Sequence, residues 1–130
     1  MAETARILIV DDNAMSRELA RDILADAGHD VADAATADQA LAALEAFRPG
    51  VVLLDWHLKG ATGGDVLARI RGPGAGRDVR VLVVTADIRP ELRAAALAAG
   101  ADALVTKPYR ASTLLAAVAA LADGTRKEAR

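Results

Sequence analysis

The sequence predicts an α/β protein built on a single doubly wound, five-stranded parallel sheet with the strand order 2-1-3-4-5. Five short apolar runs alternate with five segments of helical periodicity, which is typical of a parallel sheet covered by helices on both faces. Three runs, 7–10, 51–54 and 79–84, are almost wholly apolar, as expected of central strands. The weaker runs 30–34 and 103–105 fit the two edges.

Size and composition indicate one compact domain. The chain has 130 residues, 53% apolar and 26% charged, which is enough to bury a core and too apolar for intrinsic disorder. Only 2% of the residues are aromatic, so small aliphatic side chains must fill the core. We expect the domain to span residues 1–124 and a polar, frayed tail to follow at 125–130.

The charge balance and residue usage exclude several classes of protein. Sixteen basic and eighteen acidic residues leave a net charge of -2, which gives no electrostatic drive for binding nucleic acid. The absence of cysteine excludes disulfides and thiolate metal sites and fits a reducing compartment. No apolar run could span a bilayer and no signal peptide is recognisable, so we expect a cytoplasmic protein without a membrane partner.

The first two helices have recognisable ends. Asn13 is the expected N-cap of the first helix and Gly28 its stop. We expect the apolar residues that recur every four positions along it to form its buried face: Met15, Leu19, Ile23 and Ala27. The second helix begins after Thr36, with Gln39 completing a capping-box pattern, and ends near Phe47.

The second half of the chain repeats the pattern. A glycine-rich segment at 56–64, expected to be mobile, leads into a helix that buries the apolar residues of 66–70. Glycine and proline at 72–76 exclude regular structure there. Pro90 fits the first turn of the fourth helix, which closes at Gly100. The fifth helix buries three residues at helical spacing: Leu114, Val118 and Leu121.

Polar residues follow four of the five predicted strands. They are Asp11 and Asp12 after the first strand, Asp55 after the third, Thr85 after the fourth and Lys107 after the fifth. Parallel strands share one carboxyl edge, so these groups should meet there. Three carboxylates repel one another unless a cation joins them, and an all-oxygen site suits Mg²⁺. With a lysine and a hydroxyl beside it, such a site can hold a phosphoryl group.

These residues carry a resemblance that covers positions 6–122. The motifs are Val10-Asp11-Asp12, Leu53-Leu54-Asp55 with Gly63 eight residues later, Val84-Thr85-Ala86, and Lys107-Pro108. Their order and spacing resemble the receiver domain of two-component response regulators. The resemblance implies a flavodoxin-like (βα)5 fold and a signalling protein that accepts a phosphoryl group.

Roles for single residues follow from the same resemblance. It implies that Asp55 accepts the phosphoryl group from a phosphohistidine of a histidine kinase or a histidine phosphotransfer protein. Asp12 and Asp55 would bind Mg²⁺ directly, Asp11 would act through water, and the backbone carbonyl of His57 would complete the protein ligands.

Further roles concern the ends of the last two strands. The resemblance implies that Lys107 pairs with Asp55 or its phosphoryl oxygens. Thr85 and Ala86 would form the phosphate-binding switch. The bond between Lys107 and Pro108 is expected to be cis.

The chain departs from the family pattern at two places. Leu104 stands where the family usually has an aromatic residue coupled to the switch hydroxyl, so a rotamer swap of that ring cannot carry the signal. Leu58-Lys59 replaces a frequent Met-Pro pair, which should loosen the loop after Asp55. Tyr109 keeps an aromatic residue after the proline, and we assign it, with Leu104, to the output surface.

Simpler interpretations stand beside these. Taken alone, Asp11 and Asp12 are typical of a polar turn that caps a helix, and Lys107 of a surface lysine. We expect His57 to place its ring at the rim of the site. Trp56 is expected on the surface beside it, without a role in stacking bases.

We therefore expect a phosphorylation-controlled switch and not an enzyme that acts on an outside substrate. One alternative is a phosphorylation-independent pseudo-receiver that serves as a protein-interaction module. A second is a small Mg²⁺-dependent phosphohydrolase, but such enzymes use an acid two positions after the nucleophile, where this chain has His57. A free-standing regulator, a phosphate shuttle and a fragment of a hybrid kinase all stay open, as do the downstream target and a homodimer.

Overall fold

The computed structural model describes residues 4–72 and 78–128, with side chains as far as Ala122. The main strands are β1 (Arg6–Val10), β2 (Asp30–Ala34), β3 (Val51–Asp55), β6 (Arg80–Thr85) and β7 (Ala103–Thr106). The helices are α1 (Ala14–Asp26), α2 (Ala37–Phe47), α3 (Gly63–Ile70), α4 (Pro90–Ala98) and α5 (Ala111–Glu128). The expected alternation of strands and helices is confirmed.

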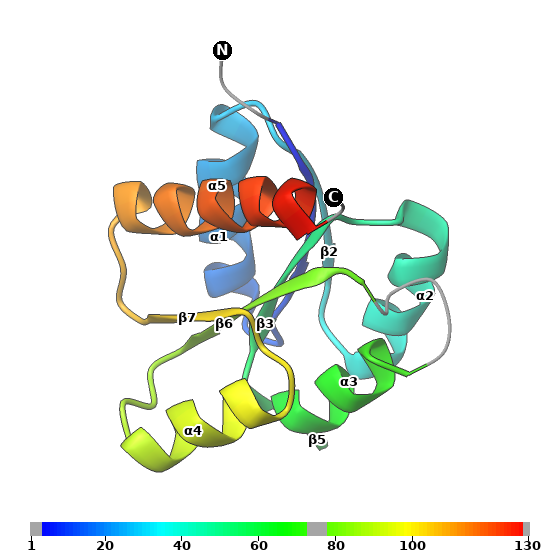
Figure 1. Cartoon of the computed structure of the whole chain (residues 1–130), viewed down its shortest axis with the longest axis vertical. Coiled ribbons are helices and arrows are strands. Elements are labelled where there is room, and N and C mark those ends of the chain that lie inside the picture. The colour runs from blue at the N-terminus through cyan, green and yellow to red at the C-terminus, as the bar shows by residue number, and fades with distance from the viewer. Residues whose placement is uncertain (1–3, 73–77, 129–130) are drawn as a thin grey trace.

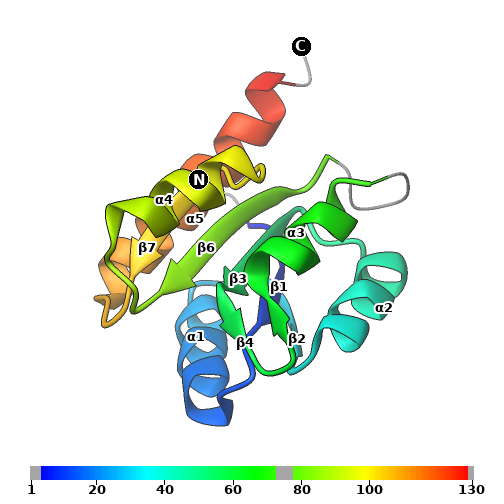
Figure 2. The same ribbon diagram turned by 90° about the horizontal axis from the view of Figure 1, so that it is seen from below.

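The five strands form one parallel sheet in the order β2-β1-β3-β6-β7, which is the predicted doubly wound, flavodoxin-like order. Helices α1 and α5 cover one face of the sheet, and α2, α3 and α4 cover the other (Figures 1 and 2). The chain changes direction across the sheet between β1 and β3. Ligands in such folds bind at that point, beyond the carboxyl ends of the strands.

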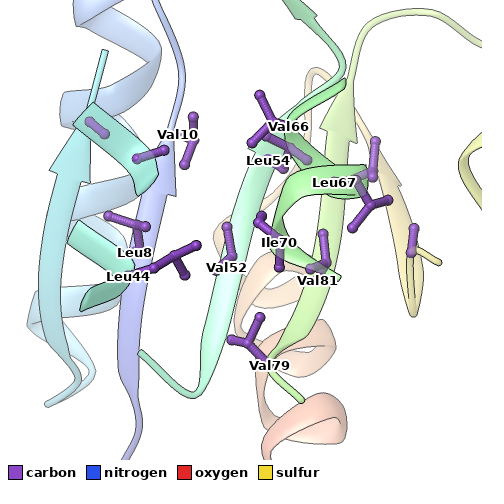
Figure 3. Close-up of a cluster of buried hydrophobic side chains, with 14 of the residues drawn as sticks. Leu8, Val10, Leu44, Val52, Leu54, Val66, Leu67, Ile70, Val79 and Val81 are labelled. Atoms are coloured by element: carbon purple, nitrogen blue, oxygen red, sulfur yellow. The ribbon is translucent and has the colours of Figure 1, made fainter. Parts of the chain in front are cut away.

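Alternate residues of each central strand point to opposite faces, so the sheet separates two cores. The α2–α3–α4 core contains Leu8, Val52 and Val81 from the strands, and Figure 3 shows them meeting Leu44 of α2 and Ile70 of α3. The α1–α5 core contains the strand residues Ile7, Ile9, Val51, Leu53, Leu82 and Val84 together with Ala20, Leu24, Leu114 and Val118 from the helices. Strands packed on both faces give the sheet edge a rigid support.

Several predicted helix ends are confirmed. The side chain of Asn13 accepts the N–H of Ser16 at 2.9 Å at the start of α1. Gly28 and Gly100, which follow α1 and α4, have φ values of 94° and 111°, a region that favours glycine. Pro90 begins α4, as expected.

The predicted buried face of α1 is wrong for three of its four members, because Met15, Leu19 and Ala27 are exposed and only Ile23 packs against the α1–α5 core. Met15 is 82% exposed and Leu19 is 53% exposed, whereas Ala20 and Leu24 are buried. Successive residues of an α-helix differ in direction by about 100°, so neighbouring positions face different sides. Spacing by fours gives the period of a stripe but not which stripe faces the sheet, and the structure buries the stripe shifted by one position. Two large apolar side chains are left on the surface.

The segment 56–64, expected to be mobile, is instead folded. It forms an antiparallel hairpin of β4 (His57–Leu58) and β5 (Ala61–Thr62), and Leu58 is only 9% exposed. Gly60 takes the positive φ of the turn. At Gly63, a Cβ atom would lie 2.7 Å from the Cα of Trp56, so glycine is needed there for close packing. The glycines of this segment therefore serve the turn and the packing of α3.

Helix α5 continues to Glu128, past Gly124, where the sequence analysis placed a polar, frayed tail. A single glycine in a helix costs about 1 kcal/mol, and the Arg, Lys and Glu that follow favour helix, so α5 continues. The domain boundary at residue 124 stays a prediction. The irregular stretch expected at 72–76 lies, apart from Gly72, outside the described residues. In the part of the chain that is described, no helix has both the length and the hydropathy to cross a bilayer.

Replacing Gly63 with Ala should lower the free energy of unfolding by about 1–3 kcal/mol, because the new methyl group must displace the backbone of Trp56. Denaturant unfolding followed by Trp56 emission measures the loss. Gly50→Ala is the matched control, since the nearest neighbour of a methyl group there, the carbonyl oxygen of Arg6, is 4.0 Å away. Equal stability of the two variants would contradict the packing argument.

His29 should make stability depend on pH. Its Nδ1 accepts the N–H of Ala5 at 3.0 Å, which requires an unprotonated nitrogen, and burial lowers the pKa of His29 below its ordinary 6.5. As the pH falls, His29 therefore takes up a proton in the unfolded chain before it does so in the folded chain. The stability that His29 contributes is complete above about pH 6.5 and is lost as the pH falls below that value. The stability difference between wild type and His29→Gln, which does not titrate, should shrink from about pH 7.5 to about pH 5.5. A constant difference would contradict this.

Candidate functional site

The predicted polar groups meet at the carboxyl edge of the sheet. Neighbouring strands bring them together: Asp11 follows β1, Asp55 ends β3, Thr85 ends β6 and Lys107 follows β7. The strands are adjacent and parallel in the order β1-β3-β6-β7, so residues more than 90 positions apart in sequence come into contact.

Three carboxylates form the centre of the site. One oxygen from each of Asp11, Asp12 and Asp55 lies within 4.8 Å of the others. Backbone N–H groups hold each carboxylate. The three bonds are Asn13 N–H to Asp11 Oδ1 at 2.9 Å, Lys59 N–H to Asp12 Oδ2 at 2.8 Å, and His57 N–H to Asp55 Oδ1 at 3.3 Å. The fold thus fixes an acidic cluster in place.

Lys107 is the cation of the site. Its Nζ lies 2.9 Å from Asp11 Oδ2 and 3.5 Å from Asp55 Oδ2. The resemblance paired this lysine with Asp55, but in the structure the shorter contact is with the more deeply buried Asp11. Burial alone would lower the pKa of Lys107, but the hydrogen bond to Asp11 and the attraction of Asp55 outweigh it and raise that pKa. The ammonium group is therefore kept charged.

The electrostatics of Asp55 suit a bound cation. Burial raises the pKa of Asp55 above its ordinary value, the nearby charge of Asp11 adds to this, and Lys107 opposes it. One oxygen from each of the three carboxylates would be available to a single small cation, and carboxylate oxygen is the ligand type that Mg²⁺ prefers. A hard divalent cation would offset the repulsion in the cluster. The residues present therefore fit Mg²⁺.

Thr85 is almost fully buried, and its hydroxyl faces the loop between β6 and α4. It is 1% exposed, and Oγ1 accepts the N–H of Asp87 at 3.2 Å. The carbonyl of Thr85 accepts the N–H of Lys107 at 2.8 Å, which ties the ends of β6 and β7 together. The next residue, Ala86, is exposed and lines a groove beside the site.

The ring of His57 makes a contact that sequence reasoning missed. As expected, it lies at the rim, with 57% of the side chain exposed, but its Nε2 is 3.1 Å from Asp87 Oδ2. Arg89 also binds Asp87, and this hydrogen bonding holds the pKa of Asp87 well below its usual range. No motif links His57 with Asp87. The only signal is positional, because each residue lies two places after the end of one of two adjacent strands.

Leu104 and Tyr109, both assigned to the output surface, lie on opposite faces of the sheet. Leu104 packs against the α2–α3–α4 core, whereas Tyr109 packs against the α1–α5 core. Burial raises the pKa of the Tyr109 phenol. The bond between Lys107 and Pro108 is cis, as expected.

A groove of about 280 Å³ opens beside the acidic cluster on the side of α1. Its lining is Ser16, Leu19, Ala86, Lys107, Pro108 and Tyr109. The exposed Leu19 thus belongs to a surface that reaches Lys107, with the exposed Met15 four positions before it on α1. The site is therefore open to a partner from the α1 side.

Known proteins are similar to this chain in sequence over most of its length. The chain is 34% identical over 116 residues to the phosphate regulon transcriptional regulatory protein PhoB of Escherichia coli, covering 89% of this chain and 51% of PhoB. It is 36% identical over 124 residues to the sensory/regulatory protein RpfC of Xanthomonas campestris, covering 94% of this chain and 17% of RpfC. The chain thus spans about half of one relative and a small part of the other.

Solved structures of related proteins have the same fold as this chain. Chemotaxis protein CheY4 of Vibrio cholerae superposes with a TM-score of 0.86 at 28% identity, covering 92% of this chain and 99% of CheY4. NtrX of Brucella abortus superposes with a TM-score of 0.90 at 30% identity, covering 97% of this chain and 29% of NtrX. A family model for the response regulator receiver domain matches residues 7–119. The chain belongs to this family, the receiver domains of two-component response regulators.

Proposed function

We propose that this chain is a signalling switch that is controlled by phosphorylation of Asp55. Receiver domains are signalling domains that histidine kinases or histidine phosphotransfer proteins phosphorylate. The observation that carries the proposal is the position of Asp55. It ends a rigid central strand, lies in a cluster of three carboxylates and has the Lys107 ammonium 3.5 Å from its Oδ2.

The proposed reaction is a transfer from nitrogen to oxygen. A carboxylate oxygen of Asp55 bonds to phosphorus as the N–P bond of the phosphohistidine breaks. The electron pair of that bond returns to the imidazole nitrogen of the donor. Lys107, close to both Asp11 and Asp55, is placed to bind a phosphoryl oxygen as negative charge gathers there. Thr85 offers a hydroxyl at the end of β6, the strand between those that lead to Asp55 and Lys107.

Mg²⁺ would bind the acidic cluster and neutralise charge on the transferred group. We propose Asp12 and Asp55 as direct ligands, with the backbone carbonyl of His57. Asp11 would act through water; its two oxygens accept from Asn13 and Lys107. Receiver domains bind Mg²⁺ at such an acidic pocket.

The output would be a shift of population between two conformations of the loop after β6. Thr85, Asp87 and Arg89 are linked by hydrogen bonds, and Arg89 is the N-cap residue of α4. A move of the Thr85 hydroxyl toward a phosphoryl group would release the N–H of Asp87. The rearrangement would then reach α4 and the adjacent Leu104 without an aromatic switch residue.

Leu104 is also the observation that favours the alternative function. A pseudo-receiver that binds partners without phosphorylation needs no coupling between Thr85 and residue 104. The two functions differ in one measurable property, which is whether Asp55 accepts a phosphoryl group.

Incubation with acetyl phosphate and Mg²⁺ should add one phosphoryl group to the wild-type chain, as read by intact mass. The adduct should disappear without Mg²⁺ and in Asp55→Asn, because the amide is not a nucleophile. Glu45→Gln, which changes an exposed acid on α2, is the matched control and should be phosphorylated like the wild type. Mg²⁺ binding without any adduct, even with a phosphorylated histidine donor, would favour the pseudo-receiver.

We propose that the groove beside Lys107 receives the histidine-bearing donor protein. The groove reaches the acidic cluster, and apolar side chains of α1 border it, as expected of a surface that docks a helix or loop of another protein. Lys107 is a common boundary of the groove and of the phosphoacceptor pocket, so a histidine presented there would approach Asp55.

Leu19→Ser should slow transfer from a phosphorylated histidine phosphotransfer protein by about tenfold, because contact area at the groove is lost. Phosphorylation by acetyl phosphate needs no docking and should not change. Leu97→Ser is the matched control, as Leu97 is an exposed leucine of α4, on the other side of the sheet. Slowing by Leu97→Ser instead would place docking on the α4 side.

A further inference from the structure

Arg17 of α1 contacts the backbone of the acidic turn. Its guanidinium donates from Nη1 to the carbonyl oxygen of Asp11 at 2.9 Å, and the Arg17 side chain is only 22% exposed. No sequence motif pointed to this residue. A charged donor on a backbone carbonyl makes a stronger bond than a neutral one, so the contact restrains the turn that carries Asp11 and Asp12.

Arg17 is itself held by Asp33 of β2. Nε of Arg17 lies 3.5 Å from Asp33 Oδ2, and Nη1 of Arg21 lies 3.2 Å from Asp33 Oδ1. Arg17 and Arg21 are four positions apart, so their side chains leave α1 on the same side. Asp33 is paired in register with Ile9 near the end of β1. The guanidinium therefore links the edge strand to the turn.

The carbonyl of Asp11 has a direct effect on Asp12. A peptide unit is planar, so the Asp11 carbonyl and the N and Cα atoms of Asp12 lie in one plane. Holding the carbonyl oxygen restrains that plane, and with it the position of the Asp12 Cα atom from which the side chain extends. The other end of that side chain is held by the N–H of Lys59 at 2.8 Å. Arg17 and Lys59 thus restrain Asp12 from both ends.

We infer that Arg17 is a positioning residue for the acidic pocket: anchored by Asp33, it holds the Asp11–Asp12 peptide so that the Asp12 carboxylate is preset to bind a divalent cation. The inference rests on the proposed function in that Mg²⁺ is the cation. It assigns part of the metal affinity to three residues outside the ligand set: Arg17, Asp33 and, through Asp12, Lys59.

The sign of the effect separates positioning from other roles. Arg17 carries a positive charge near an acidic site, so by charge alone its removal would strengthen cation binding. A role limited to packing α1 on β2 would lower the melting temperature and leave the affinity unchanged. Of the three roles, only positioning predicts that Mg²⁺ binds more weakly when the positive charge of Arg17 is removed. Partners that orient metal ligands typically change affinity by about 10- to 100-fold.

The test is a Mg²⁺ titration followed by emission of Trp56, the single tryptophan of the chain and the neighbour of Asp55, with calorimetry as a second readout. Arg17→Ala should raise the dissociation constant by at least about tenfold. Arg17→Lys keeps the charge but cannot bridge both Asp11 and Asp33, so it should recover part of the affinity. Asp33→Asn loosens the anchor without touching the turn and should weaken binding by a smaller factor.

Arg21→Ala is the matched control. It removes a positive charge from the same helix, and this charge also pairs with Asp33. The contacts of Arg21 do not include the Asp11 turn. The Mg²⁺ dissociation constant should therefore stay within about twofold of wild type. Melting temperatures of all variants report any loss of packing. If Arg17→Ala does not fold, Arg17→Lys decides the question by the same titration, because it keeps the charge and weaker binding can then come only from lost positioning.

Two results would overturn the inference. One is unchanged or tighter Mg²⁺ binding by the folded Arg17 variants, and the other is equal weakening by Arg21→Ala. Neither result affects the proposed function, because the wild type would still bind Mg²⁺ and form its adduct. Absence of Mg²⁺ binding by the wild type would overturn both.

Discussion

Three carboxylates within 4.8 Å of one another, with one ammonium group beside them, form the constraint on which the rest of the structure depends. Like charges this close raise one another's free energy, and burial of Asp55 adds to that effect. The chain holds them in place with backbone N–H groups from the turns after β1 and β3. Those turns can do so because central strands, packed on both faces, keep them rigid. The excess negative charge is what suits the pocket to a cation.

The two cores explain how so few aromatic residues support such a site. Each central strand contributes alternate Val, Leu and Ile residues to opposite faces, and α1 and α2 meet the sheet with Ala20 and Ala40 as well as leucines. Small residues let helices approach the sheet closely, so every strand end is braced from two sides. The loops beyond the strand ends, such as the one that begins after Thr85 and contains Asp87, have no such support from both faces.

The fold and the polar groups at the carboxyl edge could be predicted because both depend on the order of apolar runs and polar residues along the sequence. A run such as 51–54 indicates a buried strand, and Asp55 directly after it must lie at the edge. What could not be predicted depends on rotation and on long-range contact. Spacing by fours assigned Met15 and Leu19 to the core, since it records period but not the phase of the helix. The contact between His57 and Asp87 joins turns 30 positions apart, and no local pattern encodes it.

In the proposed switch, the two faces of the sheet would have different roles. The groove on the α1 side reaches Lys107, while Leu104 packs on the α4 side. A signal that passes from one face to the other would cross the edge of the sheet, and the contacts at the end of β6 would supply the path. The hydroxyl of Thr85 and the side chain of Arg89 both bind Asp87, one at its N–H and the other at its carboxylate. The N–H and the carboxylate both belong to Asp87, so in the proposed switch a displaced Thr85 hydroxyl would act on the first turn of α4 whatever the side chain at position 104.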